Sequence, residues 1–407
     1  PRRPTHRPEF FGDGLELSAA LRFSASIEVR TKNQARFLAI ATIALLAINL
    51  RTAVSSISPV ISYIQQDIAL PIVTIGLLGI AAPLSFALAS SLSYRPARVL
   101  GVEKTLLLTV LMIILGHLLR AFAWDATALF FGSLLSLLGM GIGNVLLPVL
   151  VRKYFPNKVG LVSSFYLTLT AISATMASFV AVPISEASGW RFSLGQWAIL
   201  AVLTVAPLAF LLGNSKPELK PEKVAGHKAI WRSPTALSIA FMQAVTAIIG
   251  YVSFAWLPLL LAEHQGVTVV QGGLLLSLFA LIGLPISLIM PILSTKYPRS
   301  QSVIVWFSFA SGVIVTLGFL LGDASLTWLW VIAFGFGPTM FPLALTLFNL
   351  RSRERSTVLA VSAFGQGVSY TTASIAAFLV GVLREVTGNW DASIWLLFAC
   401  CMIAIPV

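Results

Sequence analysis

The stretch GIGNVLLP at residues 141–148 shares the pattern G-x-G-x-x-x-x-P with GFGPTMFP at residues 335–342. Both stretches lie in apolar runs, and each run leads into a basic segment, RKYFPNK (152–158) or RSRERS (351–356). One glycine pattern in an apolar run indicates only close helix packing. The same pattern at equivalent places in two parts of a chain indicates an internal repeat, so the sequence predicts two halves of one architecture.

The apolar runs around these two motifs predict a membrane protein. The chain has 407 residues, of which 57% are hydrophobic and 10% are charged, and its mean hydropathy is +0.91. A soluble domain carries about a quarter of charged residues, whereas runs of ~20 apolar residues match the thickness of a bilayer core. We therefore expect an all-α protein with twelve transmembrane helices, over residues 37–62, 71–93, 105–123, 127–151, 159–184, 193–213, 235–262, 270–293, 302–321, 326–349, 356–383 and 390–407.

Hydrophilic segments divide these spans. The longest interior one, residues 214–234, separates a six-helix half at 37–213 from a second at 235–407. Residues 1–36 lack a signal-peptide core and are expected to form a disordered cytoplasmic tail. The last apolar run reaches the final residue, which leaves open whether its helix is cut short.

Charge predicts the orientation. Of the 27 lysines and arginines, all but Arg51, Arg120, Arg191 and Arg384 fall on one side of the spans. Arg51 lies inside the first span, and the other three are placed in the opposite loops. Basic residues collect in cytoplasmic loops, so both chain ends are expected in the cytoplasm. The same rule accounts for the net charge of +12, and no nucleic-acid partner is expected.

Arg51 is the strongest candidate for a binding residue. It lies within LLAINLRTAVSSISP (45–59), about 21 Å along the first helix. A charge at this depth costs ~3 kcal/mol or more unless it faces water or a partner, and no carboxylate lies inside the spans. Arginine presents a planar fork of donors that suits an anion. The alternative is a structural arginine bound to backbone carbonyls.

Other polar side chains in the spans are expected to complete the site. In the first span, Ser55 and Ser58 share the face of Arg51, whereas Asn49 points to another face and can instead bond a neighbouring helix. Asn144 either binds the solute or satisfies the carbonyl that Pro148 frees. The full set is Asn49, Arg51, Ser55, Asn144, Tyr166, Gln243, Tyr251 and Gln366.

The second half supplies three members of this set. Gln243 falls on one face with Thr246 and Gly250, next to Tyr251. This span is the repeat mate of the first, so its polar stripe should face Arg51. In the eleventh span, Gln366 and, one turn later, Tyr370 are likewise expected to face the cavity. Tyr166 is the counterpart of Gln366 in the fifth span.

Nothing in the sequence points to an enzyme, a metal or a cofactor. Cys400 and Cys401 are adjacent, so their side chains point to different sides of a helix and cannot pair. His117 is the one histidine inside a span, and we expect it to be neutral and hydrogen-bonded rather than a proton relay. No cluster of serine, histidine and acid, and no metal-ligand spacing, occurs in the chain.

Four segments resemble a known family. NLRTAVSSISPV (49–60), GMGIGNVLLPVLVRKYFP (139–156), SFAWLPLLL (253–261) and GLPISLIMPIL (283–293) are similar to the major facilitator superfamily, within its branch of cyanate and 2-nitroimidazole transporters. The resemblance implies a bacterial inner-membrane carrier for small solutes, with a cavity between its halves. The loop SYRPARVLGVEK (93–104) departs from the superfamily's usual pattern because it lacks the acidic residue before its arginine, which puts in doubt gating through that pair.

The sequence therefore predicts a secondary active transporter that works by alternating access. Its substrate is expected to be a small anionic or dipolar solute, similar to cyanate or a nitroimidazole, bound by Arg51, and the carrier is expected to be a monomer. One alternative is a proton-coupled exporter, which would need an acid inside the membrane. Another is a membrane sensor without transport, which would need a soluble signalling domain larger than residues 214–234.

Overall fold

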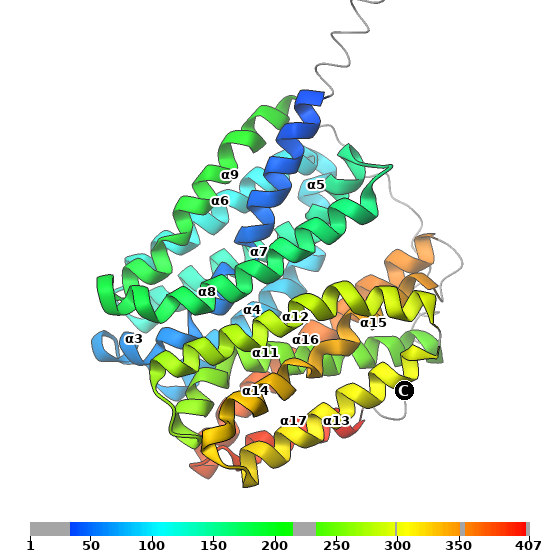
Figure 1. Ribbon diagram of the computed structural model, residues 1–407. Helices are drawn as coiled ribbons and strands as arrows, with labels where there is room; N and C mark the ends of the chain where they lie inside the picture. The colour runs from blue at the N-terminus through cyan, green and yellow to red at the C-terminus, as the bar shows by residue number, and fades with distance from the viewer. Residues whose placement is uncertain (1–32, 215–232, 298, 351–354, 404–407) are drawn as a thin grey trace, which may run out of the picture.

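The computed structural model describes residues 33–214, 233–297, 299–350 and 355–403 (Figure 1). Every element in these ranges is a helix, so the predicted all-α class is confirmed. Ten helical stretches in them are long and apolar enough to cross a membrane. One of these, Val159–Leu211, turns back at Gly189 and forms two crossings, and the short apolar helix Asp391–Met402 forms the last. Helix is thus present at each of the twelve predicted spans, and residues 404–407 of the last span lie outside the described residues.

The first half comprises residues 33–49 and the elements that follow them. These are α2 (Thr52–Ser56), η1 (Ser58–Val60), α3 (Ile61–Asp67), α4 (Ile72–Leu92), α5 (Tyr94–Leu100), α6 (Val102–Ala121), α7 (Ala126–Tyr154), α8 (Val159–Gly195), α9 (Trp197–Leu211) and η2 (Leu212–Asn214). Helix is already present at residue 33, inside the predicted tail, and residues 1–32 lie outside the described residues.

The second half follows residues 215–232, which belong to the predicted central loop and also lie outside the described residues. Its elements are α11 (Pro234–His264), α12 (Val269–Lys296), α13 (Ser300–Leu321), η3 (Ala324–Leu326), α14 (Thr327–Gly335), η4 (Gly337–Thr339), α15 (Met340–Leu350), α16 (Arg355–Thr387) and α17 (Asp391–Ile403).

The first crossing is not one continuous helix. The regular helix is interrupted at Leu50 and Arg51, where Arg51 has φ −125° and ψ −5°, and a second irregular turn surrounds Pro59. Proline has no N–H to donate, which accounts for the turn at Pro59. The break at Arg51 was not expected from the sequence. It places the guanidinium at an interruption of the helix rather than on a regular helical face.

The repeated glycines pack in the same way in both halves. A Cβ atom added to Gly143 would lie 2.9 Å from Leu50 Cδ2, and one added to Gly337 would lie 3.3 Å from Ile249 Cγ2. In each half, therefore, the second glycine of the motif lets the fourth crossing approach the first crossing of that half. Small residues allow such close approach of helix backbones in membranes.

The first glycine of each motif contacts the second crossing instead. A Cβ atom on Gly141 would lie 2.8 Å from Phe86 Cδ1, and one on Gly335 would lie 2.7 Å from Ile282 Cδ1. The motif thus has equivalent neighbours in both halves, as an internal repeat requires. The halves differ at Pro338, where the fourth crossing of the second half breaks into η4, whereas α7 continues through its own proline.

A second feature is repeated where the first crossing of each half ends. Asp67 accepts hydrogen bonds from Trp190 Nε1 (2.9 Å) and Arg191 Nη1 (2.7 Å). In the other half, Glu263 accepts from Trp390 Nε1 (3.0 Å) and Arg384 Nε (2.9 Å). In each half, therefore, a carboxylate at the end of the first crossing binds a tryptophan and an arginine. Both come from the last crossing in the first half, whereas in the second half Arg384 belongs to α16 and Trp390 directly precedes α17. The sequence does not predict this feature.

The two halves meet mainly at the end of the crossings that carries α3. There Ser277 Oγ donates to Ser178 Oγ over 3.0 Å, between α12 and α8, and the Trp256 indole of α11 lies against Gly79 of α4. Toward the opposite end, which carries α5, the halves diverge (Figure 1). We call these the α3 end and the α5 end.

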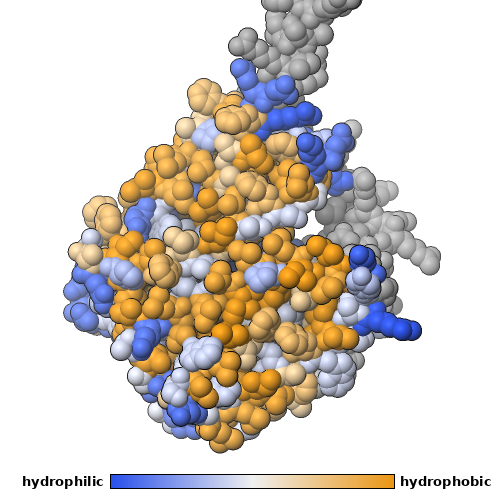
Figure 2. All heavy atoms as spheres, in the orientation of Figure 1, coloured by the Kyte–Doolittle hydropathy of each residue, from blue (hydrophilic) through white to orange (hydrophobic). Residues whose placement is uncertain are grey.

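The outer surface matches a membrane environment. Large apolar side chains such as Phe210, Ile292 and Leu321 are strongly exposed on the helices. Figure 2 shows hydrophobic residues over most of the visible face, with hydrophilic ones gathered toward its margins. A soluble monomer rarely exposes an apolar surface of this extent, so this surface is the part that contacts lipid.

Candidate functional site

Arg51 contacts aromatic side chains from other helices. Its Nη1 donates a hydrogen bond to Tyr251 Oη (3.2 Å), and the guanidinium lies over the Phe86 ring, 5.5 Å from the ring centroid. A cation over an aromatic face is favourable, more so when desolvated. No carboxylate in the described ranges forms an ion pair with Arg51. Within the described ranges, the contacts of the charge are therefore with an aromatic ring and a hydroxyl dipole.

Three aromatic rings form a cluster beside this guanidinium. Phe86, Tyr251 and Tyr370 pack edge to face in all three pairs, with centroid separations of 6.1, 5.8 and 5.9 Å. Edge-to-face pairs are the preferred geometry of aromatic contacts. Phe86 comes from α4 in the first half, and the tyrosines come from α11 and α16 in the second. The rings therefore meet across the boundary between the halves.

A cavity of about 240 Å³ lies next to this cluster, between the halves. Its walls come from α8, α11, α12, η4, α15 and α16, and are mostly apolar. The polar residues in its lining are Arg51, Thr170, Thr246, Tyr251, Ser287 and Tyr370.

The serine and threonine hydroxyls of the lining donate hydrogen bonds to carbonyls of their own helices. Thr170 donates to the Tyr166 carbonyl (2.8 Å), Thr246 to the Gln243 carbonyl (2.8 Å) and Ser287 to the Leu284 carbonyl (2.8 Å). This leaves the guanidinium and the two tyrosines as the main polar groups that face the space. No acidic residue lines the cavity in the described part of the chain. The arrangement can bind a ligand that accepts hydrogen bonds and carries negative charge.

Of the residues predicted from sequence, Arg51 and Tyr251 are brought together at the cavity. The other first-half candidates near Arg51 lie elsewhere. Asn49 Nδ2 donates to the Leu45 carbonyl (2.8 Å) and to Thr204 Oγ1 (3.2 Å), which is the helix-bonding role weighed above. Ser55 is fully buried and does not line the cavity.

The remaining candidates do not line the cavity either. Asn144 is half-buried on α7, and Tyr166 is buried one turn before Thr170. Gln243 is buried on α11, one turn from the lining residue Ala247, and its side-chain amide has no partner among the described residues. Gln366 lies one turn before Tyr370, and it is the tyrosine that reaches the cavity.

Phe86 was missed by the sequence analysis. It stands in an apolar run where nothing distinguishes it from its neighbours, and its position depends on the close approach of Gly141. The glycine motif was the available signal, since a glycine that admits a neighbouring helix also fixes which side chains of that helix reach Arg51.

One predicted placement is wrong. Arg120 was assigned to a loop, but α6 extends to Ala121 and the Arg120 side chain is completely buried among helices of the first half. Its Nη2 lies 3.5 Å from Ser56 Oγ. The last turn of α6 directs Arg120 into the helix bundle instead of the loop, so the membrane-embedded part of the chain holds a second arginine. It does not line the cavity.

His117 is also buried away from the cavity. Its Nε2 lies 3.3 Å from Thr52 Oγ1, and its Nδ1 lies 3.2 Å from the Leu194 carbonyl. Both ring nitrogens therefore have partners within the first half. This agrees with a neutral structural histidine.

Replacing His117 with glutamine tests this interpretation. We expect His117→Gln to leave the pH dependence of transport unchanged, because the ring has no contact with the cavity and glutamine can still hydrogen-bond. Uptake into proteoliposomes across a series of pH values measures this. Loss of the pH dependence in this variant, with parent-like thermal stability, would show that the histidine takes part in proton coupling.

Known proteins resemble this chain over most of its length. The model of the Major Facilitator Superfamily matches residues 43–374. The uncharacterized transporter YycB of Bacillus subtilis is 33% identical and the match covers 89% of this chain and 90% of that protein. The 2-nitroimidazole transporter of Escherichia coli is 30% identical, over 88% and 90% of the two chains.

Two further matches agree with these. The cyanate transport protein CynX of Escherichia coli is 25% identical, over 89% of this chain and 94% of that protein. The crystal structure of the nucleoside transporter NupG has a TM-score of 0.74 at 12% identity, covers 90% of this chain and 98% of that one, and so supports the fold. Together with the two-half helical fold, these matches show that the protein is a multi-pass membrane transporter that belongs to the Major Facilitator Superfamily.

Proposed function

We propose that this protein is a secondary carrier that moves a small monoanion, or a strongly dipolar nitro compound, across the bacterial inner membrane by alternating access. The observation that carries the proposal is Arg51, a cation without a carboxylate partner among the described residues, at the wall of a cavity between the two halves. Ionisable residues inside membrane proteins mark substrate pathways.

The polar groups of the cavity favour an acceptor. Arg51 offers N–H donors, and the hydroxyl of Tyr251, which accepts from Arg51, keeps its own proton to donate. A cation or a polyol would need carboxylates or amides in the lining, and the described lining contains none. Two relatives carry names that fit this chemistry, since cyanate is a monoanion and a nitroimidazole presents nitro oxygens.

The size of the cavity favours a small solute. Pockets for drug-sized ligands measure roughly 300–1,000 Å³, and this one measures about 240 Å³. Tyr251 and Tyr370 line the cavity and offer ring edges and faces to a planar solute, with Phe86 packed against them. Because the two halves of one chain already build this cavity, we propose that the carrier works as a monomer.

The packing of the halves supports alternating access. They contact each other at the α3 end and diverge at the α5 end, and such halves move by rocking around a central site. We assign the α5 end to the cytoplasm because the basic segments follow the spans that end there.

Counterflow in proteoliposomes tests the proposed substrate class. Vesicles loaded with unlabelled solute should accumulate labelled cyanate, nitrate or 2-nitroimidazole. They should not accumulate xylose or choline, which match the cavity in neither charge nor donor pattern. Exchange of xylose or choline at a rate equal to that of the anions would exclude an anion carrier.

Cysteine labelling tests the orientation. Single cysteines at Lys296 and Asp323, at opposite ends of α13, replace two exposed residues. We expect the first to react with a membrane-impermeant thiol reagent only from the cytoplasmic side, and the second only from outside. The native Cys400 and Cys401 are replaced by serine in both proteins. If both labels react from the same side, α13 does not cross the membrane and the twelve-span arrangement fails.

A further inference from the structure

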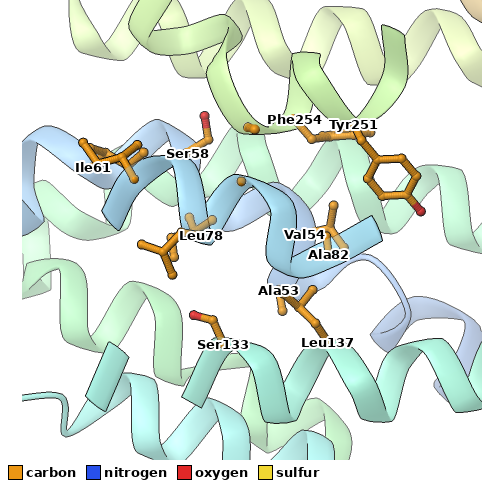
Figure 3. Close-up of a pocket in the computed structure, with 14 residues that line it drawn as sticks. Ala53, Val54, Ser58, Ile61, Leu78, Ala82, Ser133, Leu137, Tyr251 and Phe254 are labelled. Atoms are coloured by element: carbon orange, nitrogen blue, oxygen red, sulfur yellow. The ribbon is translucent and has the colours of Figure 1, made fainter. Parts of the chain in front are cut away.

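A second, smaller cavity lies nearer the α3 end. It measures about 20 Å³ and is bounded by the end of the first crossing, by the first turns of α4 and α7, and by α11 (Figure 3). Tyr251 and Phe254 line both this cavity and the larger one. These two side chains are therefore the partition between the Arg51 cavity and the space beyond it.

The small cavity contains two hydroxyl groups that lack partners. Ser58, at the end of the first crossing, is 3% exposed and Ser133, on α7, is 2% exposed. Neither hydroxyl has a hydrogen-bond partner within the described ranges. Figure 3 shows the two serines on different sides of the apolar lining, with Leu78 between them. A buried hydroxyl without a partner is unfavourable and calls for a reason.

Buried serines elsewhere on α7 and on α11 bond the backbone, whereas Ser55 and Ser85, which also lack partners among the described residues, line neither cavity. Ser136, one turn from Ser133 on α7, donates to the Ser133 carbonyl over 2.9 Å, and Ser253 on α11 donates to the Ile249 carbonyl over 2.7 Å. Serine in a membrane helix ordinarily bonds its own backbone in this way. Ser58 and Ser133 thus keep their donors for another partner.

The walls of the small cavity belong to different halves. Ser58, Ser133 and Leu78 come from the first half, whereas Tyr251 and Phe254 come from the second. A rocking motion that separates the halves at the α3 end would widen this space. At about 20 Å³ it is large enough for one water molecule and too small for the solute.

We propose that this cavity is the closed form of a second solute site, at which the hydroxyls of Ser58 and Ser133 donate to the anion once it has passed between Tyr251 and Phe254. The proposal rests on the proposed transport function. It adds to that function a second polar binding site for the solute, on the α3 side of Tyr251 and Phe254. A solute that only accepts hydrogen bonds fits this site, because its mainly apolar lining offers two hydroxyl donors.

A double variant that removes both hydroxyls tests the second site. In the double variant Ser58→Ala with Ser133→Ala, we expect the equilibrium affinity for cyanate and 2-nitroimidazole to stay within about twofold of the parent. The maximal exchange rate should fall about tenfold, as for the loss of two neutral hydrogen bonds from the transport step. Ser136→Ala is the matched control, and its rate should stay at the parent value.

The outcomes separate this proposal from the main one. A parent-like exchange rate in the double variant overturns the second site and leaves the Arg51 site intact. Failure of Arg51→Ala to weaken binding, measured in the same series, overturns the proposed function instead. Thermal stability measured on each purified variant identifies a rate loss caused by unfolding.

Thiol labelling gives a second readout that does not need a known substrate. In Ser133→Cys, with Cys400 and Cys401 changed to serine, a small methanethiosulfonate reagent added from the α3 side should modify the thiol, because the cavity opens there during the conformational cycle. Ser136→Cys should stay unmodified. Equal protection of both thiols would show that the Ser133 cavity never opens, and would overturn the proposal.

Discussion

Replacing Arg51 with alanine is expected to weaken binding of cyanate or 2-nitroimidazole by about 2–5 kcal/mol, as for the loss of one partner of a buried charged contact. This corresponds to a roughly 30-fold to several-thousandfold rise in Kd. The variant should fold, because removing a membrane-embedded cation that lacks a carboxylate partner in the described residues lowers the cost of insertion. Affinity and thermal stability are measured on the same purified samples.

Two further variants sharpen this prediction. Arg51→Lys should bind more weakly than the parent despite its charge, because an ammonium cannot reproduce the planar fork of donors. Arg120→Gln is the matched control, since Arg120 is a buried arginine that does not line the cavity. It should change stability and leave affinity alone. A structural role for Arg51 gives the reverse pattern, with loss of folded protein in Arg51→Ala and normal affinity in what remains.

Of the substitutions proposed here, Gly116→Ala is expected to cause the largest loss of thermal stability. A Cβ atom at Gly116 would lie 2.4 Å from the backbone nitrogen of Ser136, so α6 and α7 would have to move apart. Overpacking of this kind costs about 1–3 kcal/mol and occasionally more. The thermal unfolding temperature of the purified transporter measures the effect.

The matched control for Gly116 is Gly367→Ala on α16. No atom lies within 4 Å of a Cβ at that position among the described residues. Alanine favours a helix by about 1 kcal/mol over glycine, so the control should be as stable as the parent or slightly more so. Equal unfolding temperatures for Gly116→Ala and Gly367→Ala would mean that α6 and α7 are not packed as described.

The fold could be predicted from the sequence because a bilayer leaves few choices. Every backbone polar group must be bonded inside the membrane, so long apolar runs become helices. The repeated glycine motif then identified the two halves, and its equivalent contacts at Gly143 and Gly337 confirm them. The break at Arg51 could not be predicted in this way, because it depends on the helices packed around the first crossing.

The site was predictable only where charge or polarity stands out. Arg51 is conspicuous in an apolar run, and the repeat logic led from it to Tyr251 in the mate span. Phe86 is not conspicuous, because a phenylalanine in an apolar run has the same composition signal whether it faces lipid or a buried arginine. Arg120 was misplaced for a related reason. An arginine at the end of an apolar run looks the same whether its side chain enters the loop or the bundle.

Anomalous diffraction from crystals soaked in selenocyanate tests the central claim most directly, because selenocyanate is a linear monoanion that carries a heavy scatterer. The claim is that Arg51 binds an anion in the cavity between the halves. We expect one selenium peak in that cavity, between the Arg51 guanidinium and Tyr370, and no such peak in Arg51→Ala. A peak that persists in Arg51→Ala, or one that lies at Arg120 with the cavity vacant, would contradict the account.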